Sequence, residues 1–185
     1  MPTSIIENGK IRMQQTVEVT KKEFSHVRTG RANPAILDQV MIEYYGVPTP
    51  LTQIAGVSAP EAQLIVIKPY DKTMLNQIEK AIHAANLGFN PSSDGTVIRI
   101  AIPPLTENTR KDLVKNVKKM AEESKIAIRN IRRDVIDHLK KLEKDSLISE
   151  DELKRHNENV QKMTDKFIEN IDELANEKEK MIMTI

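Results

Sequence analysis

Residues that break helices are confined to the middle of this 185-residue chain. Eight of its nine prolines lie within residues 34–104, and five of its six glycines lie within 30–95. Proline interrupts a helix because it has no backbone donor, and glycine because its backbone is unusually free. Residues 1–29 and 105–185 can therefore form long helices, whereas the middle cannot. This distribution predicts a two-domain α+β protein in which one domain is inserted into the other.

The two flanks predict an elongated three-helix bundle, because each helical segment carries one apolar stripe. A capping box, Ser149-Glu-Asp-Glu152, marks the start of the last helix. Thr106 is the expected N-cap of the helix before it, and residues 5–28 carry a weaker stripe. A helix of about 40 residues would be roughly 60 Å long. In the last helix, apolar residues recur every seven positions, at Leu153, Val160, Phe167, Leu174 and Met181.

The middle segment predicts a small α+β domain of about 75 residues. Asp71 is expected to cap a helix that ends at Gly88. Proline and glycine predict turns at 46–50 and 90–95. Strands are predicted at 40–45, 64–67 and 96–102, and 51–57 is a candidate for another.

Composition excludes several classes of protein. The chain has no cysteine, which rules out disulfides and thiol chemistry and is typical of a reducing compartment. Aromatic residues make up only 3%, so a large aromatic core is not available. The N-terminus lacks the apolar region of a signal peptide, and no run approaches the roughly 20 apolar residues of a membrane span. We expect a soluble, cytoplasmic protein without a membrane segment.

Charge is segregated along the chain, although the formal net charge is only +1. Residues 110–144 hold 12 Lys and Arg against 6 Asp and Glu, a net charge of +6. Residues 145–185 hold 6 against 11, a net charge of −5. Such blocks report on binding partners more than on fold.

No set of residues has catalytic or metal-binding spacing. The four histidines are scattered, and there are no cysteines to complete a metal site. Neither a phosphate-binding glycine loop nor a nucleophile elbow is present. Asp134, Asp137 and His138 lie close together on a charged helix and are expected to be surface residues. We expect no catalytic residues, no metal and no cofactor.

Three arginines lie within five residues in the middle of the second long helix, at Arg129, Arg132 and Arg133. Like charges this close repel, whereas the planar guanidinium matches the geometry of phosphate. With Ile128 at 0° and 100° per residue, the apolar stripe spans about 260° to 20° and a basic face about 40° to 140°. A solvated charged face is the alternative, but this sorting favours an anionic partner, most simply RNA recognised through its backbone and shape. The basic face consists of Lys111, Lys115, Lys118, Lys125, Arg129, Arg132 and Arg133.

The three arginines have different expected roles. Arg129 lies well within the basic face. Arg132 lies at about 40°, beside the apolar stripe, so that its stem can pack while its guanidinium reaches phosphate. Arg133 points about 100° away from Arg132 and has Asp137 as an i,i+4 partner. We therefore expect Arg132 and Arg129 to be the RNA anchors, with Arg133 third.

Two other functions are open on these residues. The apolar stripes would serve self-association in a coiled-coil scaffold or chaperone, although a symmetric oligomer does not need a one-sided basic face. The other alternative is a small hydrolase in the inserted domain, which no catalytic set supports. Salt separates RNA binding from self-association, because phosphate binding weakens steeply as salt rises, whereas apolar association does not.

Short motifs occur in order along residues 27–165. The first are Val27-Arg-Thr-Gly-Arg-Ala32, Glu43-Tyr-Tyr-Gly-Val-Pro-Thr-Pro-Leu51 and Leu87-Gly-Phe-Asn-Pro91. The next are Ile98-Arg-Ile100, Pro103-Pro-Leu-Thr-Glu107 with Arg110, and Ala127-Ile-Arg-Asn-Ile-Arg-Arg133. The last are Ile148-Ser-Glu-Asp-Glu152 and Gln161-Lys-Met-Thr-Asp165. In these motifs the chain closely resembles the ribosome recycling factor family, whereas its first 25 and last 15 residues carry only a generic helical pattern.

The resemblance implies an L-shaped protein, with a three-helix bundle formed by 1–29 plus 106–185 and an inserted β/α/β domain at 32–102. The hinge would consist of Thr29, Gly30 and Arg31 paired with Pro103, Pro104 and Leu105. The resemblance also implies a non-enzymatic translation factor that binds the large ribosomal subunit after termination. With elongation factor G and GTP, such a factor splits the ribosome and releases messenger RNA and transfer RNA. A monomer is expected.

Carried onto this sequence, the contacts with ribosomal RNA would centre on Arg129 and Arg132. Arg110 has an alternative role, because its angle of about 0° points it toward the apolar stripe, where it would fix the start of the helix near the hinge. The full set of expected RNA-binding residues is Arg28, Arg31, Arg110, Lys118, Lys125, Arg129, Arg132 and Arg133.

Overall fold

The structure, a computed structural model, describes residues 1–184 and divides into two compact units. The helical unit consists of Met1–Phe24 and Val114–Lys180. The mixed unit consists of Ser25–Leu113 and the last residues from Met181. Long helices and short antiparallel strands confirm the predicted α+β class.

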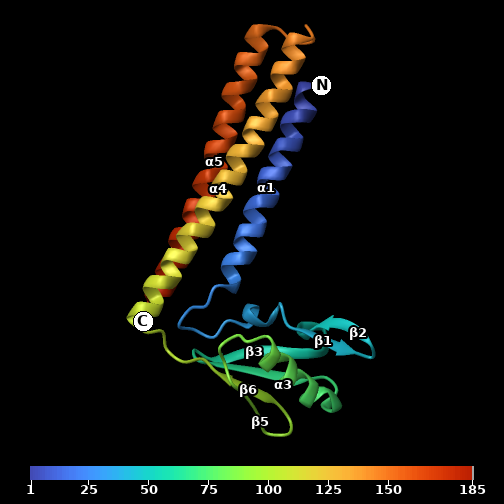
Figure 1. Cartoon of the computed structure of the whole chain (residues 1–185), viewed down its shortest axis with the longest axis vertical. Coiled ribbons are helices and arrows are strands. Elements are labelled where there is room, and N and C mark those ends of the chain that lie inside the picture. Colours follow the sequence, from blue (N-terminus) through green and yellow to red (C-terminus); the bar gives the residue numbers. More distant parts are fainter. Residues whose placement is uncertain (185) are drawn as a thin grey trace. The chain divides into compact units, whose positions relative to one another are not determined.

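Three long helices form the helical unit, and the predicted caps of two of them are present. The Thr106 hydroxyl accepts from the Thr109 amide at 3.2 Å. The Ser149 and Glu152 side chains each accept from the other's backbone amide, at 3.2 and 2.8 Å. These bonds satisfy donors that the first helical turn leaves unpaired, so both helices begin where the sequence predicts. The helices are α1 (Pro2–His26), α4 (Glu107–Lys144) and α5 (Glu150–Met183) (Figure 1).

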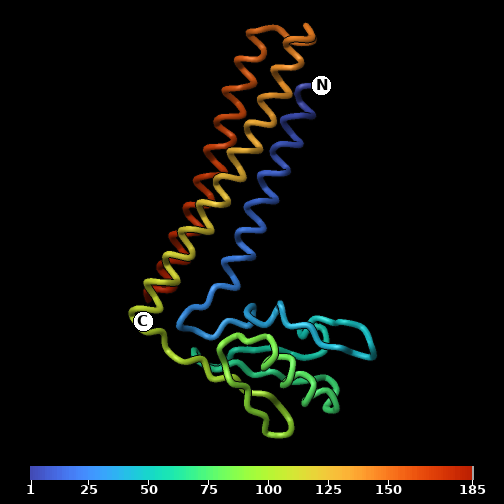
Figure 2. Tube along the Cα trace, in the orientation of Figure 1, coloured from blue at the N-terminus to red at the C-terminus, as the bar shows by residue number. Residues whose placement is uncertain are grey.

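In α4 and α5 the apolar residues with no exposed surface recur every eleven residues, while buried residues such as Ala121, Ile128 and Val135 recur every seven. Eleven residues in three turns lies close to a straight helix, whereas a strict seven-residue pattern drifts by about 20° per repeat. Figure 2 shows both helices running without a sharp kink. Met181 is 58% exposed, so the prediction that it continues the apolar stripe is wrong. The apolar residues of α4 and α5 with no exposed surface are Val117, Ile128, Leu139, Val160, Ile171 and Ile182.

Helix α1 approaches α4 closely at a glycine. A Cβ atom on Gly9 would lie 2.5 Å from Cγ2 of Val135, so any larger residue would displace the valine. Eleven residues further along α1, the buried hydroxyls of Thr20 and Ser124 lie 2.7 Å apart and are hydrogen-bonded. The eleven-residue spacing therefore extends to the α1 contact.

The mixed unit contains two antiparallel sheets around a core rich in isoleucine. Ile65 and Ile67 of one strand and Ile98 and Ile100 of its neighbour are at most 1% exposed, while the residues between them point outward. The first sheet pairs β1 (Met41–Tyr44) with β2 (Val47–Pro50). The second has the order β3 (Ala55–Glu61), β4 (Leu64–Pro69), β6 (Ile98–Ala101), β5 (Pro91–Ser93). The helical segments are η1 (Pro34–Leu37), α2 (Leu51–Ile54), η2 (Lys72–Met74) and α3 (Leu75–Ala84), of which α3 contacts β1 and β5.

The strands predicted at 40–45, 64–67 and 96–102 are confirmed, but the predicted turns are partly wrong. Tyr45 and Gly46, with φ of 48° and 79°, make the first turn, and the next four residues pair as β2. Three residues of the second predicted turn pair as β5. Both strands contain proline, which usually indicates a turn in a sequence, so the sequence predicts turns for β2 and β5. Proline is nevertheless tolerated in edge strands.

The candidate strand at 51–57 and the predicted end of the helix at Gly88 also need correction. Residues 51–54 form one helical turn, and the predicted strand begins only at Ala55. Asp71 caps the 3-10 helix η2, which leads into α3, by accepting from the Thr73 amide at 2.9 Å. The following helix ends at Ala84, because Asn86 adopts the left-handed conformation (φ 49°) before Gly88 is reached.

The two segments that connect the sheet to the long helices are tied to one turn. The Ala32 amide donates to the Ala62 carbonyl at 2.6 Å, and the Ile102 amide donates to the Gln63 carbonyl at 2.8 Å. Because Ala62 and Gln63 are consecutive, the two segments enter the sheet next to each other. The hinge at 29–31 and 103–105, just outside these two hydrogen bonds, stays a prediction.

Candidate RNA-binding face of α4

The predicted RNA-binding residues are divided between the two units. The mixed unit holds Arg28, Arg31 and Arg110. The helical unit holds Lys118, Lys125, Arg129, Arg132 and Arg133, all on α4.

One edge of the basic face lies directly against α5. Lys118, Lys125 and Arg132 are spaced by seven residues along α4, and each meets a polar side chain of α5. Lys118 lies 3.9 Å from Glu179, and Lys125 lies 3.0 Å from Asp172. Some of the positive charges of α4 therefore pair with negative charges of α5. The expectation that the two charged segments report mainly on binding partners needs correction to this extent.

Lys125 forms ion pairs with two carboxylates of the helical unit. Its side chain is 18% exposed, and its Nζ lies 3.0 Å from Asp172 and 3.1 Å from Glu122. Hydrogen bonds to Asp172 and then Glu122 raise the pKa of Lys125. Its charge is balanced within the protein, so a phosphate would have to compete with two carboxylates.

Arg129 is half-buried and also has a carboxylate partner. Its Nη1 donates to Glu122 Oε1 at 3.0 Å. Glu122 thus holds Arg129 and Lys125 with its two oxygens, and hydrogen bonds from these cations lower the pKa of Glu122.

Arg132 differs because its partner is neutral. The residue is half-buried, as its position beside the apolar stripe predicts. Its Nη1 donates to Gln161 Oε1 at 2.9 Å, and its Nε is buried without a hydrogen-bond partner. The positive charge of Arg132 is therefore held in place but not neutralised.

Arg133 is exposed and donates to Asn130 Oδ1 at 3.4 Å. The expected pairing with Asp137 is not found among the described residues. Such a long bond to a neutral amide restrains the side chain weakly.

The arginines of the mixed unit make contacts with the backbone and with an aromatic ring. Arg28 donates to the Pro103 carbonyl at 3.1 Å and lies 5.0 Å from the centre of the Phe89 ring. Arg110 donates to the Met183 carbonyl at 3.3 Å, which supports its alternative role of fixing the start of the helix. Arg31 is exposed.

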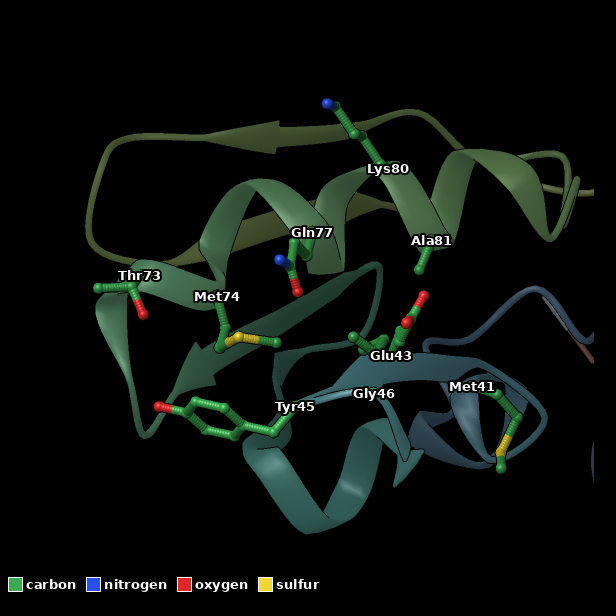
Figure 3. Close-up of a pocket in the computed structure, with 10 residues that line it drawn as sticks. Met41, Glu43, Tyr45, Gly46, Thr73, Met74, Gln77, Lys80 and Ala81 are labelled. Carbon is green, nitrogen blue, oxygen red and sulfur yellow. The ribbon is translucent and has the colours of Figure 1, made fainter. Parts of the chain in front are cut away.

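The mixed unit also contains a cavity of about 740 Å³ between the β1–β2 hairpin and α3 (Figure 3). Its ionisable lining residues include Glu43 and Lys80, and Figure 3 shows Lys80 pointing away from Glu43. Within residues 1–184, no histidine or cysteine lines this cavity, and no group of acidic, histidine or cysteine residues could hold a metal ion. The cavity therefore gives the hydrolase alternative no support.

Sequence reasoning missed Glu122, Gln161 and Asp165 as residues that control the arginines. On a helical projection, Glu122 is no more than an interruption of the basic face. A usable signal exists, because Asp165, Asp172 and Glu179 recur every seven residues, the same spacing as the α4 cations that they face.

The two units define a class of α+β protein in which one face of a long helix presents arginines. None of the helices described in residues 1–184 is long and apolar enough to cross a membrane.

Comparison with known proteins identifies the family. The family model for ribosome recycling factor matches residues 20–183. The chain is 54% identical over 185 residues to the ribosome-recycling factor of Bacillus licheniformis, with both proteins covered completely. It is 55% identical over 180 residues to that of Caldicellulosiruptor saccharolyticus, covering 97% of this chain and 98% of the relative. The chain belongs to the ribosome recycling factor family.

Solved structures agree with this assignment. A solution structure of a ribosome recycling factor matches with a TM-score of 0.82 and 40% identity, covering 100% of this chain and 98% of the other. The T. thermophilus factor, in a structure with E. coli elongation factor G bound to the E. coli post-termination complex, matches over both full chains with a TM-score of 0.70 and 47% identity.

Proposed function

We propose that this chain binds the large ribosomal subunit after termination and, with elongation factor G and GTP, splits the post-termination ribosome and releases messenger RNA and transfer RNA. The observation that carries the proposal is Arg132, a cation held on α4 by a neutral partner in a chain of the ribosome recycling factor family. The T. thermophilus relative bound with elongation factor G to a post-termination complex supports the choice of partners.

In this proposal Arg132 and Arg129 anchor the helical unit to ribosomal RNA through phosphates. The chain has no catalytic role of its own, because GTP hydrolysis belongs to elongation factor G. It acts in the cytoplasm as a monomer and without a cofactor. The bundle at 1–29 plus 106–185 and the insert at 32–102 move about the hinge at 29–31 and 103–105. Two adjacent connections allow such rotation without unfolding of either part.

The test is splitting of post-termination ribosomes in the presence of elongation factor G and GTP. We expect Arg132→Ala to lower the rate by about tenfold or more, the effect of losing one charge-assisted contact. Helicity and melting temperature should not change. Lys141→Ala is the matched control, because it removes one exposed positive charge of α4 outside the basic face. Equal rates for the wild type and Arg132→Ala would exclude Arg132 as an anchor.

A further inference from the structure

Arg132 is oriented by a two-residue relay on α5. Gln161 Oε1 accepts from Arg132 Nη1 at 2.9 Å, and Gln161 Nε2 donates to Asp165 Oδ1 at 2.7 Å. Arginine can only donate and a carboxylate only accepts, so the direction of the Gln161 amide is determined by its two neighbours. Arg132 and Asp165 therefore require the same orientation, with Oε1 toward the arginine and Nε2 toward the carboxylate.

The relay replaces the ion pair that the spacing of the helices would otherwise form. On α5, Asp165, Asp172 and Glu179 are spaced by seven residues, as are the facing cations of α4. The two lysines meet carboxylates directly. At the third position Gln161 stands between Arg132 and Asp165, which converts an ion pair into a hydrogen-bonded chain.

The amide of Gln161, in the place of a carboxylate, has an electrostatic consequence for Arg132. A carboxylate in direct contact would neutralise the guanidinium, and an incoming phosphate would first have to displace it. An amide restrains the guanidinium through one hydrogen bond and leaves its full charge. Among residues 1–184, Gln161 is the one hydrogen-bond partner found for Arg132, whose Nε is buried without a partner, so contact with an external acceptor falls to the two terminal nitrogens.

We infer that Gln161 and Asp165 are positioning residues that hold Arg132 ready for an RNA phosphate without neutralising it. This inference rests on the proposed function, because it takes Arg132 as an RNA anchor. It assigns a role to the Gln161-Lys-Met-Thr-Asp165 motif, which lies on α5 outside the arginine cluster.

The experiment measures binding of the full chain to purified large ribosomal subunits at several salt concentrations. In Gln161→Glu a carboxylate of nearly the same shape meets Arg132. We expect binding to weaken several-fold and the salt dependence to fall by about one phosphate contact. The melting temperature should stay the same or rise. A purely structural role for Gln161 would instead lower the melting temperature and leave the salt dependence unchanged, which would overturn the inference.

Asp165→Asn tests the second residue of the relay. An asparagine at this position can donate as well as accept, so it no longer requires Nε2 of Gln161 and holds the amide less firmly in the orientation that Arg132 needs. We expect an affinity between those of the wild type and Gln161→Glu. Wild-type affinity would remove Asp165 from the relay.

Asn176→Asp is the control for added charge. It introduces one negative charge on the same helix, 15 residues from Gln161, or about 22 Å along the axis and beyond the screening length at physiological salt. We expect no change in salt dependence. A change equal to that of Gln161→Glu would show that net charge alone is responsible and would overturn the inference.

Combining each variant with Arg132→Ala separates the role of the relay from the role of the anchor. If the relay acts through Arg132, Gln161→Glu has no further effect once the arginine is absent. If Arg132→Ala weakens binding and Gln161→Glu does not, the relay is excluded and the anchor stands. If Arg132→Ala binds like the wild type, Arg132 is excluded as an anchor and the relay fails with it.

Discussion

At the residue scale, the partner of each α4 cation determines what that cation can do. Lys125 and Arg129 share Glu122, whereas Arg132 has Gln161. Three cations that look alike on a helical projection therefore differ in how readily they can accept a new anion. Lys125 and Arg129 would each have to exchange a carboxylate for a phosphate, whereas Arg132, with a neutral partner, keeps its full charge for binding.

A residue-scale prediction concerns the turn between β5 and β6. Hydrogen bonds from the Val97 and Thr96 amides and from Arg99 lower the pKa of Asp94 to about 2. Its unfolded value is about 3.9, so the ionised side chain stabilises the fold above that pH. This contribution should disappear as pH falls from about 4 to 2.

The measurement compares melting temperatures of the wild type and Asp94→Asn across pH. Asparagine keeps an acceptor oxygen but not the charge. We expect the wild type to melt higher at pH 7 and the difference to vanish near pH 2. A difference that does not depend on pH would contradict the assignment.

At the scale of elements, the apolar residues of α4 and α5 with no exposed surface recur every eleven positions. This spacing lies close to the natural turn of a straight helix. Helix α1 approaches α4 closely at Gly9, where Val135 occupies the space that a side chain would need.

We predict that Gly9→Ala destabilises the helical unit even though alanine is the better helix former. The gain in helix propensity is about 1 kcal/mol, whereas overpacking a rigid β-branched neighbour costs about 1–3 kcal/mol. In a Val135→Ala background the clash is absent, so the same change should stabilise. Denaturant unfolding of the four proteins of this cycle measures both effects. Destabilisation of equal size in both backgrounds would rule out the contact.

At the scale of the whole molecule, two compact units are joined by connections that enter the sheet next to each other. Ala32 and Ile102 are hydrogen-bonded to Ala62 and Gln63, and the residues predicted to form the hinge lie just outside them. Gly30 lies in one of these segments, and a Cβ added there would meet no atom within 4 Å.

Stiffening this glycine should therefore impair movement rather than folding. Gly30→Ala should be neutral in stability or stabilise by about 0.4–1 kcal/mol, keep its affinity for the large subunit, and slow ribosome splitting. Gly56→Ala is the matched control in β3, where the nearest atom to an added Cβ is the Lys68 carbonyl at 3.9 Å. Equal splitting rates for both variants would remove Gly30 from the hinge.

Local sequence information predicted much of this protein. The α+β class, the caps at Thr106 and Ser149, three strands and the arginines of α4 all depend on residues within one or two turns of each other. Such patterns act before any tertiary contact forms. The short strands β2 and β5 escaped prediction because they exist only through pairing with a neighbouring strand.

The tertiary structure decided which charges are available. The sequence alone determined that α4 carries a basic face with Arg132 at its edge. Only the packing of α5 against α4 brought Asp172 to Lys125 and Gln161 to Arg132, across separations of 47 and 29 residues. Those contacts depend on the register in which α4 and α5 pack, and no local motif determines that register. The physical difference between a neutralised and a free cation therefore arises in the folded bundle.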